Sequence, residues 1–168
     1  MQKITHQQLL DWLKKEVKLS LGCTEPIAIA YAAAVAAKYL NAPILKITGN
    51  ISENLYKNAM GVTIPGTSYC GVTLAAAIGA IGGNADADLE VLKDITATQI
   101  TEAYIFNESG NVCLNAVDAT DFIFIDITLY SLSDQCRVVI QGSHTNVTEV
   151  YINNIKQILV RDLICLLY

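Results

Sequence analysis

Apolar residues recur at helical spacing in the first part of the chain. Leu9, Leu10, Leu13 and Val17 fall on one face of an amphipathic helix that we predict over residues 3–19. The same reasoning predicts further helices, with a strand between the first two of them. The expected helices cover 25–40, 71–81 and 86–106, the last bent near residues 96–98, and the strand covers 44–51.

After residue 110 the pattern changes to alternation. Between residues 122 and 130, isoleucines and a leucine at odd positions alternate with Phe, Asp and Thr, which is typical of a half-buried strand. Short turns separate the runs and predict antiparallel hairpins. We therefore predict an α+β fold with N-terminal helices and a mainly antiparallel sheet built largely from the C-terminal half. The expected strands are 112–117, 122–130, 136–140 and 146–152, so that a domain over 1–152 precedes an apolar tail over 153–168.

Composition narrows the class of protein. The chain has 168 residues, of which 52% are hydrophobic and 16% charged, and its net charge is −5. An acidic chain is a poor nucleic-acid binder, and the longest apolar run, 27–37, is too short for a membrane helix. The N-terminus has no apolar signal core, so we expect a cytoplasmic protein without nucleic-acid or membrane partners. The high apolar content suggests a surface that a partner covers.

Five cysteines without a CxxC pair argue against a disulfide framework or a self-contained zinc site. Cys23 differs from the others because it precedes a helix whose N-terminus we expect Thr24 to cap. Unpaired N–H groups and the helix dipole there stabilise a thiolate, which is a nucleophile or a metal ligand. The alternative for Cys23 is a small residue at a tight helix entry.

Three further polar segments are candidates for binding. Asn54 and Asn58 would share a helical face with Lys57 nearby, which suits a carboxylate, although a solvated turn explains them equally. A Gly-containing turn at 65–67 enters a helix and could present N–H groups to an anion, but it lacks the P-loop pattern. The loop that holds His144 could hydrogen-bond a ligand or relay a proton, or could be an exposed turn.

Taken together, these segments resemble the N-terminal part of the L-cysteine desulfidase family, the UPF0597 group, which is related to iron–sulfur L-serine dehydratases. The resemblance covers about residues 8–152. It rests on six segments in one order: Gly22–Pro26, Ser52–Asn58, Gly61–Thr67, Gly79-x-x-Gly82-Gly83-Asn84, Leu89–Lys93 and Gly142-x-His144-Thr145-Asn146.

The resemblance implies a lyase that converts L-cysteine to pyruvate, sulfide and ammonia, or L-serine to pyruvate, water and ammonia, at a [4Fe-4S] cluster held by three cysteines. The first cluster cysteine carries over to Cys23. The other two lie in a C-terminal half that this chain lacks, so we expect the chain alone to hold no cluster and to be inactive without that half. The chain is then either a truncated protein or one half of a split enzyme whose C-terminal half is a separately encoded partner. The residues that would line the amino-acid site are Ser52, Asn54, Lys57, Asn58, Thr67, His144 and Asn146.

A second hypothesis is a non-catalytic remnant that binds an amino acid or dimerises. Surface left exposed by a missing half tends to self-associate, so both hypotheses predict a homo-oligomer.

Overall fold

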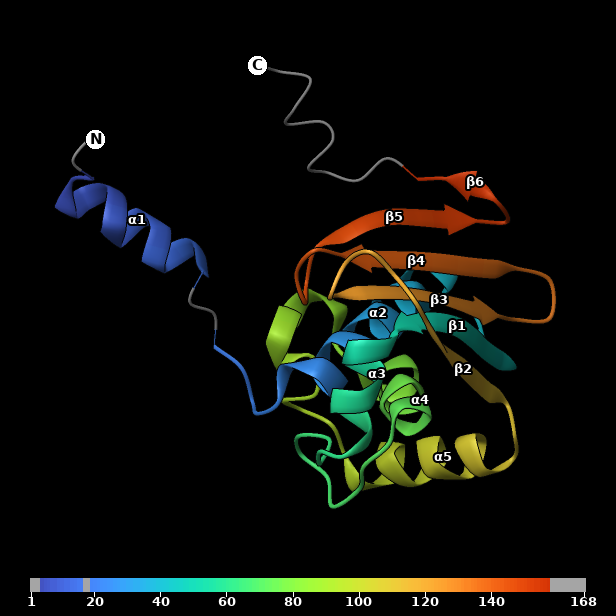
Figure 1. Cartoon of the computed structure of the whole chain (residues 1–168). Helices are drawn as coiled ribbons and strands as arrows, with labels where there is room; N and C mark the ends of the chain where they lie inside the picture. The colour runs from blue at the N-terminus through green and yellow to red at the C-terminus, as the bar shows by residue number, and fades with distance from the viewer. Residues whose placement is uncertain (1–3, 17–18, 158–168) are drawn as a thin grey trace.

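A computed structural model describes residues 4–16 and 19–157, and it places a layer of helices on one face of a single sheet (Figure 1). The predicted α+β class is confirmed. The helices are α1 (His6–Glu16), α2 (Thr24–Leu40), α3 (Glu53–Met60), α4 (Val72–Gly82), the 3-10 helix η1 (Ala85–Glu90) and α5 (Ala97–Glu108), and the strands are β1 (Lys46–Ser52), β2 (Val112–Val117), β3 (Phe124–Tyr130), β4 (Gln135–Gln141), β5 (Val147–Ile152) and β6 (Ile155–Lys156).

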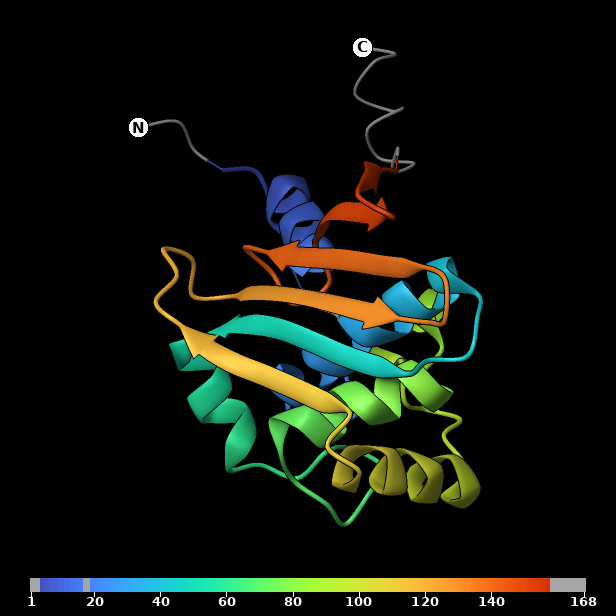
Figure 2. The same cartoon turned by 90° about the vertical axis from the view of Figure 1, so that its right-hand side faces the viewer.

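The sheet has the strand order β2-β1-β3-β4-β5-β6. Strands β1 and β2 run parallel, whereas every other neighbouring pair is antiparallel, which confirms the prediction of a mainly antiparallel sheet (Figure 2). A parallel pair needs a long connection. Here α3, α4, η1 and α5 supply it, so that β1 lies between two strands from the second half of the chain.

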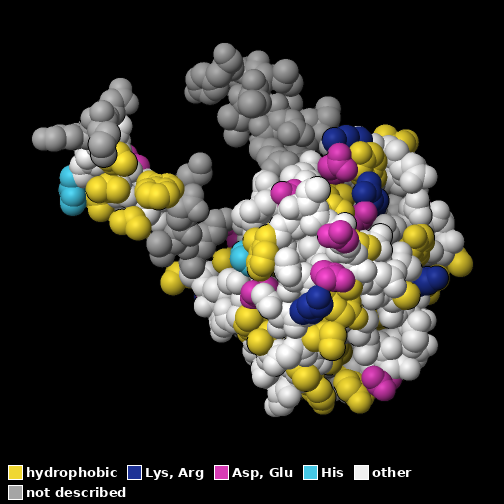
Figure 3. All heavy atoms as spheres, viewed as in Figure 1, with side chains coloured by type: hydrophobic (Ala, Val, Ile, Leu, Met, Phe, Trp, Pro, Cys, Tyr) yellow, Lys and Arg dark blue, Asp and Glu magenta, His cyan; other side chains and the backbone are white. Residues whose placement is uncertain are grey.

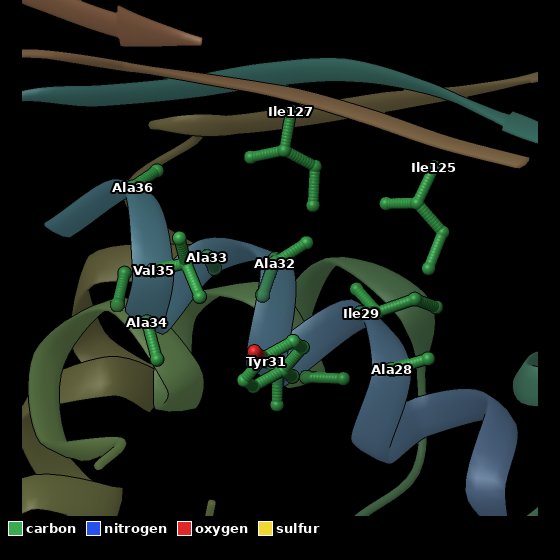
Figure 4. Close-up of a cluster of buried hydrophobic side chains, with 14 of the residues drawn as sticks. Ala28, Ile29, Tyr31, Ala32, Ala33, Ala34, Val35, Ala36, Ile125 and Ile127 are labelled. Atoms are coloured by element: carbon green, nitrogen blue, oxygen red, sulfur yellow. The ribbon is translucent and has the colours of Figure 1, made fainter. Parts of the chain in front are cut away.

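Helix α2 lies at the centre of the domain. It packs against α4 on one side and against β3 and β4 on the other, and it is buried from Pro26 to Ala36. Ile125 and Ile127 of β3 point from the sheet toward it (Figure 4). A helix that is apolar on every side is stable only when it is covered all round, so the Ala-rich sequence of α2 suits this position.

The crossing of α2 and α4 depends on a glycine. A Cβ atom at Gly79 would lie 2.1 Å from the carbonyl oxygen of Ala30 and 2.5 Å from its Cα. Because no side chain fits there, glycine at position 79 sets how closely the two helix backbones approach. Both helices are rich in alanine, whose small side chain allows the two backbones to lie close together along the rest of the contact.

Several predicted boundaries differ from the structure. The predicted helix over 86–106 is two elements, since Asp88 has a left-handed φ of 47° inside η1 and α5 begins afresh after Thr96. Thr96 caps α5 in a reciprocal pair with Gln99, so residues 96–98 start a helix rather than bend one. The first strand starts two residues later than predicted, at Lys46, and it continues through Ser52.

The two ends of the described chain form one element each, helix α1 and strand β6. Helix α1 forms within the predicted 3–19 segment but stands apart from the body of the domain (Figure 1). Residues 155–156 of the expected tail form β6 on the sheet edge. Residues 158–168, including Cys165, lie outside the described residues. Within the described ranges, no helix is long and apolar enough to cross a membrane.

Candidate functional site

The polar segments singled out in the sequence meet around the N-terminus of α2. Asn58, in the last turn of α3, hydrogen-bonds to Glu25 of α2, and His144, from the loop between β4 and β5, interacts electrostatically with the same carboxylate. Gly22 packs against Pro65, because a Cβ at position 22 would lie 3.0 Å from the proline Cγ. Four separate stretches of chain therefore share one site on the side of the domain from which α1 departs (Figure 1).

Glu25 is the centre of this site, although the sequence pattern indicated only a first-turn acid there. Its Oε2 accepts hydrogen bonds from the Cys23 thiol at 2.9 Å and from the Thr24 hydroxyl at 3.3 Å. Its Oε1 accepts one from Asn58 Nδ2 at 3.4 Å. The spacing of Cys23 and Glu25 is the sequence signal for this role of Glu25. A carboxylate two residues after a cysteine, in the first turn of a helix, can fold back toward the thiol.

Cys23 occupies the N-cap position of α2, whereas the sequence favoured Thr24 for that role. Its Sγ makes no capping hydrogen bond and donates to Glu25 instead. Burial raises the pKa of the thiol, and the hydrogen bond to the Glu25 carboxylate raises it further, while backbone N–H groups act in the opposite direction. The prediction of a stabilised thiolate is therefore wrong for this arrangement: the helix N-terminus does favour the anion, but the neighbouring carboxylate and burial outweigh it.

Near neutral pH the Glu25 carboxylate is charged, whereas the His144 imidazole is neutral. The hydrogen bond from Cys23 is the main cause of the lowered pKa of Glu25, with smaller support from Asn58 and His144, so Glu25 is an anion. Burial lowers the pKa of His144, and the nearby Glu25 opposes that shift only in part. The site therefore combines a fixed negative charge, a neutral imidazole and a protonated thiol.

Three of the remaining predicted residues, Asn54, Lys57 and Asn146, lie on α3 or on the loop that carries His144. Asn54 and Lys57 are exposed on α3, where Lys57 Nζ pairs with Glu53 Oε2 at 2.8 Å and Asn54 lies one turn before Asn58. Asn146 donates from Nδ2 to the Gln141 carbonyl at 2.8 Å, which fixes the shape of the loop that carries His144.

Ser52 and Thr67 have their hydroxyls engaged with the backbone. Ser52, at the end of β1, is 2% exposed; its Oγ donates to the Phe122 carbonyl at 2.7 Å and accepts from the Phe124 N–H at 3.4 Å. Thr67 Oγ1 donates to the Ile64 carbonyl at 2.9 Å within its own turn. It also borders an open hollow of about 490 Å³ beside the first turns of α5.

Ser52→Ala is expected to destabilise the fold by about 1 kcal/mol or more, because it removes the buried hydroxyl that donates to the Phe122 carbonyl. Urea denaturation of the variant measures this loss. Ser68→Ala, at an exposed serine, is the matched control and is expected to leave the free energy of unfolding within about 0.5 kcal/mol of the parent. Equal stabilities for the two variants would contradict the structural role of Ser52.

An iron–sulfur cluster can be tested against the donors present. In the described ranges, no three of the His, Cys, Asp and Glu side chains gather as a metal-ligand set. Cys23 is partly buried at the site, Cys70 and Cys113 are exposed, and Cys136 is buried in the core. The described residues offer a single thiol at the site, so they do not fit a cubane cluster by themselves.

The fold and the site define an α+β domain with a carboxylate-centred polar cluster at the start of its central helix. Its sequence is similar to UPF0597 proteins of three bacteria. Identity is 54% over 148 residues for one from Klebsiella pneumoniae, 45% over 147 residues for one from Shewanella sediminis, and 44% over 146 residues for one from Photobacterium profundum.

These matches cover 87–88% of this chain but only 34–35% of each relative. The chain is thus homologous to UPF0597 proteins and spans about a third of the length of the relatives it matches. No family model and no solved structure matches the chain.

Proposed function

We propose that this chain is the amino-acid-binding part of a cytoplasmic L-cysteine desulfidase-like or L-serine dehydratase-like lyase, active when joined to the rest of a UPF0597 protein. The observation that carries the proposal is the meeting of Cys23, Glu25, Asn58 and His144 from three separate segments. All four residues belong to segments of the family resemblance.

The charges at the site suit a small zwitterion. The Glu25 carboxylate complements an α-ammonium group. The exposed Asn54 amide and the Lys57 ammonium, which is paired with Glu53 in this structure, are the groups of α3 proposed to bind the α-carboxylate. Elimination removes the α-proton and then expels sulfide or water from the β-carbon. His144 is the group in this cluster that can accept a proton at pH 7, since its imidazole is neutral there.

Cys23 is proposed as one of the cluster ligands, the other two being supplied by the part of the UPF0597 proteins that lies outside the match. Ligation requires a thiolate. In this chain alone, burial and the Glu25 carboxylate raise the pKa of the Cys23 thiol and so oppose that state.

A chimera tests the function. This chain replaces the matching segment of the Klebsiella pneumoniae protein, and the product is purified anaerobically and assayed for sulfide and pyruvate from L-cysteine, and for pyruvate from L-serine. We expect turnover that is lost in Cys23→Ala together with the bound iron. Retained iron in that variant would contradict the role of Cys23.

The second hypothesis, a non-catalytic binding or dimerising domain, makes a different prediction. It requires that the chimera bind L-serine or self-associate without releasing pyruvate from either amino acid. A positive control is the unmodified Klebsiella pneumoniae protein under the same conditions. Turnover by that protein but not by the chimera would contradict the proposal for this chain.

A further inference from the structure

Helix α1 carries an apolar face without a cover. Leu9, Leu10, Trp12 and Leu13, here called the α1 face, project from one side of the helix with 40%, 37%, 61% and 54% of their surface exposed. The opposite side is polar, with Gln7 Nε2 donating to Asp11 Oδ1 at 2.8 Å. Large apolar side chains that share one helical face are typical of a helix that binds in a groove.

The described domain offers this face no packing partner. The elements that pack together extend from α2 to β6, and α1 is not among them. Figure 3 shows apolar side chains gathered on the protruding helix, away from the body of the molecule. Helices α2 and α4, the apolar helices of the core, are already covered by the sheet, by each other and by α5.

An isolated helix of this length is marginal in water. Helix α1 has 11 residues, and helices shorter than about 12–15 residues depend on tertiary packing for their stability. A face of this composition on a helix that needs a partner indicates that the partner is a protein surface with an apolar groove.

We infer that the α1 face docks onto the part of the UPF0597 proteins that has no counterpart in this chain. The inference rests on the proposed function, and two observations support this choice of occupant. About two thirds of each relative lies outside the match, which is ample to form a second domain. The chain also runs from α1 through residues 17–22 directly to Cys23, so a domain that holds α1 lies beside the site that needs further ligands.

A membrane surface is a weaker candidate. Amphipathic helices that bind bilayers are drawn to anionic lipids by positive charge, whereas α1 balances its two lysines with Asp11 and Glu16 and has no net positive charge. A second copy of the chain would cover the α1 face, but it would bring only the same side chains to the site and no further cluster ligands.

Hydrogen exchange measures the docking directly. Exchange of the α1 amides is followed in this chain and in the chimera described above. We expect fast exchange in the chain alone and at least about tenfold slower exchange in the chimera, because docking suppresses local opening. Leu9→Glu or Leu13→Glu in the chimera is expected to restore fast exchange. Gln7→Glu is the matched control, since it places the same charge on the polar side of α1, where Gln7 and Asp11 lie.

The outcomes separate the alternatives. Unprotected α1 amides in a chimera whose α2 amides remain protected would overturn the inference. Protection in the chain alone that grows with protein concentration would assign the face to a second copy, and protection that appears only with anionic vesicles would assign it to a membrane. A docked α1 in an inactive chimera would contradict the proposed function alone, whereas an active chimera with unprotected α1 amides would contradict this inference alone.

Discussion

Glu25→Gln is expected to weaken the affinity of the chain for L-serine by about tenfold or more. A hydrogen bond to a charged partner contributes about 1.5–3 kcal/mol, and 1.4 kcal/mol is a factor of ten in affinity. The substitution keeps the shape of the side chain but removes the negative charge that would face the substrate ammonium. Calorimetric titration of parent and variant measures the change.

The same substitution changes two pKa values in a direction that the geometry fixes. The Glu25 carboxylate raises the pKa of the Cys23 thiol, so its removal lowers that pKa and increases the rate of alkylation of Cys23 by iodoacetamide at pH 8. The Glu25 carboxylate also raises the pKa of His144, so this pKa is lower in Glu25→Gln than in the parent. Mass spectrometry follows the thiol, and NMR titration follows the imidazole.

Glu102→Gln is the control for these experiments, because it removes a charge from an exposed position on α5. It should leave the affinity, the alkylation rate and the imidazole pKa unchanged. If both variants behaved alike, net charge rather than the contacts of Glu25 would govern the site.

Gly79→Val is expected to cost about 3 kcal/mol or more of folding stability. Its Cβ would overlap the backbone of Ala30, which belongs to the central helix and cannot move without separating α2 from the sheet. The measurement is the midpoint of urea denaturation, together with the yield of folded protein.

The control for this prediction is Gly61→Ala. Gly61 has a φ of −93°, and a Cβ there would meet no atom within 4 Å. This variant is expected to remain within about 0.5 kcal/mol of the parent. A folded, stable Gly79→Val protein would contradict the close α2–α4 contact.

Local pattern was sufficient for most elements but not for their assembly. Alternation predicted β3 correctly within two residues, and the Ala-rich run predicted α2. The place of β1 between β2 and β3 depends on long-range pairing, which no periodicity records. The start of α5 lies within a continuous apolar pattern, and it is marked only by the Thr96 and Gln99 capping pair.

The candidate site was predictable as a set of segments rather than as a set of contacts. The sequence indicated Cys23, Asn58 and His144 separately, and the fold brings them around Glu25. The charge state of the thiol could not be derived from helix position alone, because it depends on a carboxylate whose side-chain direction is set by the packed structure. Ser52 was predicted to bind the substrate, but its hydroxyl is hydrogen-bonded to the backbone of Phe122 and Phe124 at the start of β3.

The central claim is that the groups around Glu25 form an amino-acid site, and an NMR titration tests it most directly. The ¹⁵N-labelled chain is titrated with L-serine and, separately, with 3-hydroxypropanoate, which lacks the ammonium group. The account predicts that L-serine shifts the amides of residues 23–25, 58 and 142–146, that 3-hydroxypropanoate does not, and that Glu25→Gln needs about tenfold or more L-serine for the same shifts. Shifts elsewhere in the domain, or none at saturating L-serine in a folded sample, would contradict it.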